Sequence, residues 1–144
     1  MKTLHRLLAA DAPAGVVLVR ALVGGVFLVE GIQKFLFPAE LGVGRFSKIG
    51  IPSPEVMAPF VGVVEIAGGV LLLVGLLTRL AAIPLIVDML VAISTTKIPI
   101  LLKQGFWKMA HEARVDWCML LGSLFLLLAG AGACSIDARL TRGK

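Results

Sequence analysis

Four long apolar stretches alternate with short polar segments along this chain of 144 residues. They cover residues 15–35, 56–77, 80–102 and 115–131. A helix needs roughly 20 mostly apolar residues to cross a hydrocarbon core about 30 Å thick, and each stretch is close to that length. The pattern therefore predicts an all-α protein, a four-helix transmembrane bundle that forms a single membrane domain over residues 1–144.

Prolines and glycines separate these stretches. They are frequent in residues 38–55, where isolated apolar side chains predict an irregular segment lying against the membrane. Only a few residues, from Gly75 to Arg79, join the second and third stretches, so we expect an antiparallel hairpin there. Pro99 predicts an end or a bend in the third helix. Residues 103–114 mix aromatic and basic side chains, which indicates an interfacial segment between the third and fourth helices.

Composition excludes a water-soluble core. Hydrophobic residues make up 58% of the chain and charged residues 16%, whereas soluble domains contain about 45–50% and about 25%. The net charge of +5 does not indicate nucleic-acid binding, because most basic residues flank the apolar stretches, where they contact lipid headgroups. We expect a multi-pass protein of a bacterial or archaeal cytoplasmic membrane, with its termini on the cytoplasmic side and the lipid bilayer as its first partner.

Six ionisable residues lie within the apolar stretches or at their rims. A charged side chain inside a bilayer costs roughly 2.5–3.5 kcal/mol on insertion scales, so each needs a partner or a function. They form the candidate polar network or ligand-binding set, and no catalytic residue is identified among them: Arg20, Glu30, Lys34, Glu65, Asp88 and Asp116.

Antiparallel helices place these charges at two depths. Counting residues from the ends of the stretches groups Glu30, Lys34 and Glu65 toward one membrane face, with Asp116 on the same side, and Arg20 with Asp88 toward the other. Glu30 also precedes Lys34 by four residues, the favoured order for a pair within one helix. Pairing that only locks the helices and a polar cavity for a ligand are equally consistent with this arrangement.

Glu65 has small neighbours, which leave room beside its carboxyl group. Gly62, Gly68 and Gly69 would admit either another helix or the headgroup of a ligand. A carboxyl group there could exchange a proton with a quinol or make a structural hydrogen bond. The residue type does not choose between these two roles.

The chain contains few residues suited to metal or thiol chemistry. Its two histidines, His5 and His111, lie outside the apolar stretches, and no metal-binding spacing is present, so no metal or covalent cofactor is expected. Cys118 and Cys134 are 16 residues apart, too far to bridge along one helix, and are interpreted as buried inert thiols.

Several motifs resemble those of DoxX-like membrane proteins. The first stretch, with Arg20, Phe27, Gly31 and Lys34, resembles the opening signature of that family. The central block is the most specific part, and it runs from Gly50-Ile-Pro-Ser-Pro54 through Glu65-Ile-Ala-Gly68-Gly69 to Thr78-Arg79. Ser135-Ile-Asp137 resembles the C-terminal signature. Two departures are Glu30, where the family often has histidine, and Gly130-Ala-Gly-Ala-Cys134, which replaces a glycine-proline-glycine.

The resemblance implies a four-helix membrane bundle associated with quinone-linked or thiol-linked respiratory redox systems. DoxD, a relative, is a subunit of a thiosulfate:quinone oxidoreductase. We therefore expect an accessory subunit, not catalytic alone, that contributes to a quinone pocket and contacts other oxidoreductase subunits. A scaffold whose buried charges serve only helix packing is the alternative. A small transporter is a third hypothesis. It is less favoured because four helices without an internal repeat are few for one protomer to alternate access, although a homo-oligomer could supply more.

Overall fold

The computed structural model describes residues 13–142, and this part of the chain is helical without strands. Four long helices occur in the predicted order. Residues 38–55, which were expected to be irregular, contain a short helix. The elements are α2 (Val16–Leu36), α3 (Val43–Lys48), α4 (Pro54–Val74), α5 (Thr78–Ala92), the π-helical turn η1 (Ile93–Lys97), α6 (Ile98–Gln104), α7 (Phe106–Glu112), α8 (Arg114–Ala129) and α9 (Ile136–Arg142). The all-α class predicted from the apolar pattern is confirmed.

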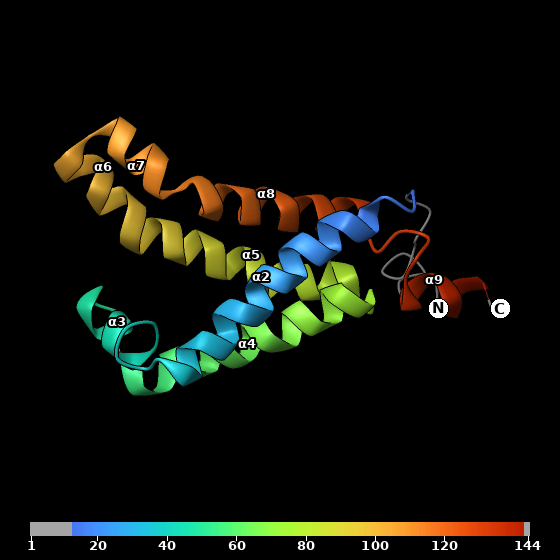
Figure 1. Cartoon of the computed structure of the whole chain (residues 1–144), viewed down its shortest axis with the longest axis horizontal. Coiled ribbons are helices and arrows are strands. Elements are labelled where there is room, and N and C mark those ends of the chain that lie inside the picture. The colour runs from blue at the N-terminus through green and yellow to red at the C-terminus, as the bar shows by residue number, and fades with distance from the viewer. Residues whose placement is uncertain (1–12, 143–144) are drawn as a thin grey trace.

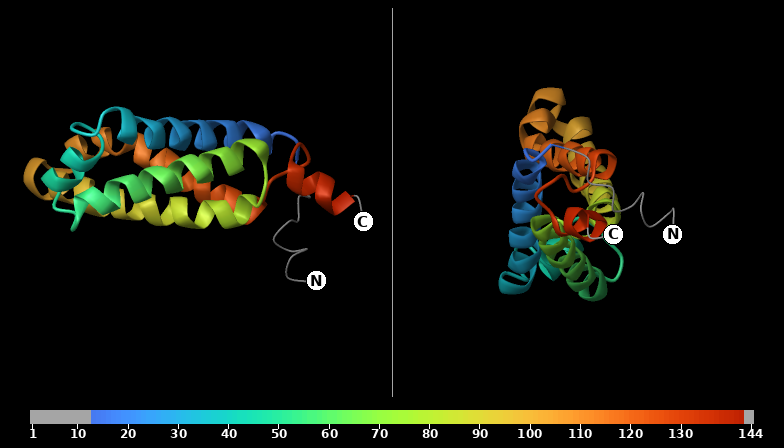
Figure 2. Two further views of the ribbon diagram at one scale, coloured as in Figure 1. Left: turned by 90° about the horizontal axis from the view of Figure 1, so that it is seen from below. Right: turned by 90° about the vertical axis from the view of Figure 1, so that its right-hand side faces the viewer.

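The long helices form two packed pairs. Helix α2 packs along α4, and α5 packs along α8. The pairs lie closest at the end that carries α9 and separate toward the end that carries α3, α6 and α7 (Figure 1). Viewed from below, the long helices run side by side along the length of the molecule (Figure 2). The divergence leaves space between the pairs at one end only.

Glycines bring α2 and α4 into close contact. A Cβ atom added at Gly24 would lie 2.8 Å from the carbonyl oxygen of Gly69, and one added at Gly31 would lie 2.7 Å from that of Gly62. No larger residue fits without moving a backbone, as in other membrane helices that pack through small residues. The stripe of Gly24, Phe27 and Gly31 is buried, so it is a helix-packing face.

The turn between α4 and α5 is as short as predicted, but α4 ends three residues before the expected limit at residue 77. Gly75 adopts φ +68° and closes the helix in the left-handed conformation. Leu77 also has a positive φ, +49°, although it is not glycine. The antiparallel hairpin is confirmed.

Pro99 bends the third helix and does not end it. A proline lacks the N–H that would bond four residues back, and the backbone widens into η1 before α6 continues to Gln104. Three segments are long and apolar enough to cross a membrane: Val16–Leu36, Pro54–Val74 and Thr78–Gln104.

Helix α8 has 16 residues, fewer than a typical span, so the fourth crossing stays a prediction. Helix α7 occupies the expected interfacial segment, and Phe106 and Trp107 at its start are 58% and 83% exposed.

Both cysteines are exposed, so the interpretation of Cys118 and Cys134 as buried thiols is wrong. Cys118 lies on an outer face of α8, and Cys134 lies in the loop after it.

Candidate functional site

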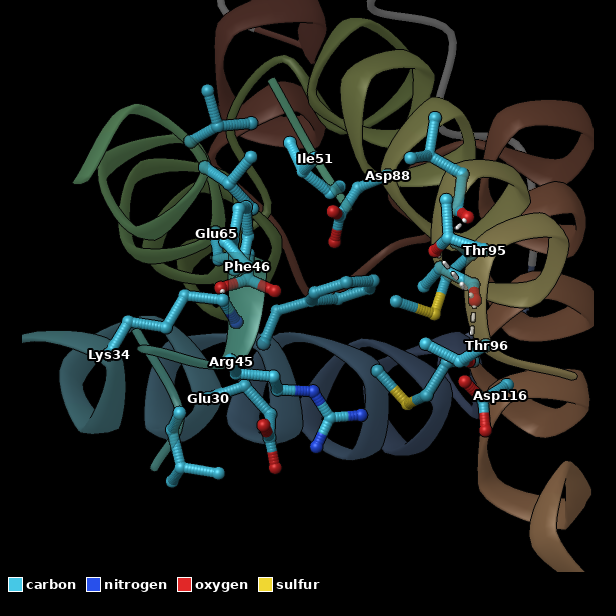
Figure 3. Close-up of a pocket in the computed structure, with 18 of the residues that line it drawn as sticks. Glu30, Lys34, Arg45, Phe46, Ile51, Glu65, Asp88, Thr95, Thr96 and Asp116 are labelled. Carbon is cyan, nitrogen blue, oxygen red and sulfur yellow. Dashed lines mark hydrogen bonds and ion pairs between the residues drawn. The ribbon is translucent and has the colours of Figure 1, made fainter. Parts of the chain in front are cut away.

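A cavity of about 720 Å³ lies where the two helix pairs diverge. Residues from α2, α4, α5, η1 and α8 line it, together with Arg45, Phe46, Ile49 and Ile51 from α3 and the segment that follows. Most of its lining side chains are aliphatic or aromatic, and several charged groups interrupt this apolar surface (Figure 3). An apolar cavity with a few convergent polar groups is the usual form of a small-molecule site.

Lys34 and Glu65 form an ion pair across the α2–α4 contact. The Nζ atom of Lys34 lies 2.6 Å from Oε2 of Glu65, and Glu65 is only 3% exposed. Figure 3 shows the two side chains meeting on the left wall of the cavity. Gly62 and Gly31 allow the two helices to approach closely beside this pair. The ion pair confirms the expected grouping of Lys34 with Glu65.

Asp88 enters the same cavity from α5. Its carboxyl group is close enough to Glu65 to interact with it, and its Oδ2 atom is buried without a hydrogen-bond partner among residues 13–142. The expected grouping of Asp88 with Arg20 is wrong. Similar depths in two helices do not bring side chains together when the helix faces differ, and the face of α5 that bears Asp88 turns toward Glu65.

The opposite wall holds a second ion pair that the sequence analysis missed. Lys97 Nζ lies 3.3 Å from Oδ2 of Asp116, and both side chains are mostly buried. Lys97 ends η1, whose wider turn directs it toward α8. The hydroxyl groups of Thr95 and Thr96 line this wall and donate to the carbonyl oxygens of Val91 and Ala92, at 2.8 and 2.6 Å. At the sequence level Lys97, two residues before Pro99, was interpreted only as a basic residue at the end of an apolar stretch.

Glu30 and Arg45 lie together along the lower edge of the cavity in Figure 3. Both are exposed. The expected pair between Glu30 and Lys34 is not formed in the described part of the chain, because the ammonium group of Lys34 turns to Glu65. Arg45 was counted at the sequence level only as a flanking charge. Its position on α3, at the edge of the cavity, depends on the tertiary fold, which short-range spacing does not reveal.

Arg20 lies at the other end of the bundle and has a different environment. It is 2% exposed and binds backbone carbonyl groups. Its Nε donates to Leu72 at 2.9 Å and its Nη2 to Leu73 at 3.2 Å, at the end of α4. Its Nη1 donates to Ala131 at 2.7 Å and Cys134 at 2.8 Å, in the loop after α8. Arg20 therefore ties three parts of the chain together.

Asp137 completes this end of the molecule. Its Oδ1 accepts from the backbone N–H of Leu77 at 2.8 Å, and its Oδ2 accepts from that of Thr78 at 3.1 Å. These two N–H groups lie at the start of α5 and have no partner within the helix, so a carboxylate is favoured there. Its own N–H donates to the carbonyl of Gly75 at 3.0 Å. We call Arg20, Asp137 and the backbone groups that they bind the latch. At the sequence level Asp137 stood out only as part of a signature.

The latch and the cavity therefore divide the predicted residues. Glu30, Lys34, Glu65, Asp88 and Asp116 line one cavity, whereas Arg20 does not reach it. Together the cavity groups present an ammonium donor and a buried carboxylate acceptor beside apolar walls.

The helices and cavity define the class as an α-helical integral membrane protein with a polar site inside its bundle. A match to the DoxX family extends over residues 15–98. The chain belongs to the DoxX family.

Relatives of known sequence support this assignment. The chain is similar to the uncharacterized membrane protein Rv3486 of Mycobacterium tuberculosis, with 53% identity over 95% of this chain and 88% of that protein. It is 34% identical to the Bacillus subtilis protein named "Putative oxidoreductase CatD", over 90% of each chain. An uncharacterized protein of Haemophilus influenzae is 34% identical over 82% of this chain and 84% of that one. No solved structure matches the chain.

Proposed function

We propose that this protein is an accessory membrane subunit of a quinone-linked or thiol-linked redox assembly, and that its cavity holds the headgroup of a quinone or quinol. One observation carries the proposal. Lys34, Glu65 and Asp88 converge on an apolar cavity of about 720 Å³, and an oxygen of Asp88 is left there without a partner among the described residues. A buried polar atom without a partner is costly, so it points to a guest that donates a hydrogen bond.

Each polar group has a role toward such a ligand. The ammonium group of Lys34 donates to a carbonyl oxygen of the quinone. The free oxygen of Asp88 accepts from a hydroxyl group of the quinol, and Glu65 holds the charge of Lys34 beside it. Interconversion of quinone and quinol requires two electrons and two protons. In this proposal the carboxyl groups exchange protons with the ring oxygens, and a partner oxidoreductase exchanges the electrons.

The relative named "Putative oxidoreductase CatD" supports a connection with redox chemistry. The scaffold alternative draws support from the latch, where Arg20 and Asp137 bind backbone groups and serve packing. That argument does not extend to the cavity, where Lys34, Glu65 and Asp88 line open space and do not bind backbone groups. The two hypotheses therefore differ most sharply at Glu65 and Asp88.

Binding of a decyl-tailed benzoquinone to the full chain in lipid nanodiscs tests the proposal. We expect Glu65→Gln to weaken binding about tenfold, because loss of its charge frees Lys34 from its fixed position. Glu40→Gln is the control, since Glu40 is exposed and does not line the cavity. Equal affinity of the wild type and Glu65→Gln, or no saturable binding by the wild type, would contradict a quinone site.

A further inference from the structure

The cavity has two edges of different chemistry. The first, which we call the apolar edge, consists of residues on α4 and α5 that line the cavity and are also exposed: Phe60, Pro84, Val87 and Val91. The second, the charged edge, consists of Glu30 and Arg45, which line the cavity and are also exposed. Figure 3 shows Glu30 and Arg45 in the lower half of the view and Asp88 in the upper half.

The apolar edge follows from the geometry of α4 and α5. These helices meet at the turn between Val74 and Thr78 and separate toward the end that carries α3 (Figure 1). Pro84, Val87 and Val91 follow one another at helical spacing, so they form a continuous stripe along α5. Both helices belong to segments able to cross the membrane. Exposed apolar side chains on such helices face acyl chains, so this edge opens toward lipid.

We infer that the ligand enters the cavity from the lipid through the apolar edge, and that it is a long-tailed quinone or quinol whose tail remains between α4 and α5. This inference rests on the proposed function and adds the class of ligand. The polar groups fix the orientation. Lys34, Glu65 and Asp88 hold the ring, the charged edge faces the aqueous side, and the tail leaves in the opposite direction. A quinone without a tail would leave the apolar edge unfilled and bind weakly.

Two valines of nearly equal exposure provide a matched test. Val87 is 55% exposed and lines the cavity, whereas Val63 on α4 is 58% exposed and does not. Tryptophan at position 87 would obstruct the apolar edge, and tryptophan at position 63 would add the same bulk on a face toward lipid only. We expect Val87→Trp to weaken binding of the decyl-tailed benzoquinone at least about tenfold in nanodiscs, and Val63→Trp to leave it unchanged. The thermal midpoint of each variant shows whether it is folded.

A photoreactive probe provides a second test of the entry route, on the wild-type protein. A benzoquinone with a diazirine at the end of its tail should label the apolar edge of the wild-type protein, as mapped by mass spectrometry. Labelling at the charged edge would overturn the inference, as would equal binding by Val87→Trp and Val63→Trp or tighter binding of the same ring without its tail. In each of these cases a quinone site at Glu65 would survive. Failure of the wild type to bind either form would refute the proposed function as well.

Discussion

The two ends of the bundle use buried charge in different ways. In the latch, Arg20 makes four hydrogen bonds to backbone carbonyl groups, and both carboxylate oxygens of Asp137 accept from backbone N–H groups. In the cavity, Lys34 and Glu65 bind each other, and an oxygen of Asp88 has no hydrogen-bond partner in the described residues. With four of its five N–H donors bound to backbone, Arg20 has little capacity left for a ligand. A charge that faces an open cavity retains that capacity.

Arg20→Gln should produce the largest loss of stability. It removes most of the donors that satisfy the carbonyl groups of Leu72, Leu73, Ala131 and Cys134. Leaving several of these buried acceptors without partners should cost at least about 3 kcal/mol. Reduced accumulation in membranes and a lower thermal midpoint in detergent would report it. Quinone affinity per folded molecule should not change, and a loss of affinity at unchanged stability would remove the distinction between the two ends.

Asp137→Ala should have the next largest effect. It frees the N–H groups of Leu77 and Thr78 at the start of α5, and loss of a helix N-cap costs about 1–2 kcal/mol. The control is Arg139→Ala, two residues away on the same short helix and exposed. Hydrogen exchange at the start of α5 should increase in Asp137→Ala alone. Equal exchange in both variants would show that this carboxylate is not a cap.

Asp88→Asn should act on binding more than on folding. The amide keeps the shape of the side chain but loses the charge that accepts from a quinol hydroxyl group, so affinity for the quinol should fall about fivefold. Calorimetric titration of the reduced decyl-tailed probe into nanodiscs would measure this change. An affinity equal to that of the wild type would assign Asp88 to helix packing.

The exposed pair on α7 should give the smallest effect. The hydrogen bond from Lys108 lowers the pKa of the Glu112 carboxyl group below its ordinary value of 4.5. The lowered folded-state pKa means that this pair stabilises the protein above about pH 4.5, and that the contribution is lost as pH falls through the folded pKa. Because both side chains are exposed to water, the contribution of the pair is small, and Glu112→Gln should lower the thermal midpoint at pH 7 only slightly. The pKa of Glu112, measured by nuclear magnetic resonance titration, should rise toward its ordinary value in Lys108→Met.

The helices could be predicted from the sequence because a bilayer imposes a length and a hydrophobicity that the residues must display. The hairpin at Gly75 follows from local chemistry and was also predictable. The partners of the charges were less so. Lys34 and Glu65 were grouped correctly by depth, but Asp88 was assigned to Arg20, because counting residues gives the height of a side chain and not the face from which it projects.

Other features had no sequence signal that short-range reasoning could use. The pair between Lys97 and Asp116 depends on the π-helical turn before Pro99, and such a turn changes the helix face by an amount that periodicity does not contain. The latch joins Arg20 to carbonyl groups more than 50 residues away. Every residue has a backbone carbonyl group, so the sequence does not indicate which of them Arg20 binds. The role of Arg20 could be recognised only from the tertiary structure.

The division between latch and cavity is tested most directly by Glu65→Gln and Arg20→Gln measured side by side, in the same nanodiscs and with the same decyl-tailed benzoquinone. Thermal midpoint and affinity per folded molecule are the two quantities. Glu65→Gln should lose about tenfold in affinity with a smaller fall in the midpoint than that of Arg20→Gln, and Arg20→Gln should lower the midpoint with its affinity retained. If both variants lower the midpoint and neither changes affinity, the buried charges at both ends hold helices together and the cavity is not a quinone site.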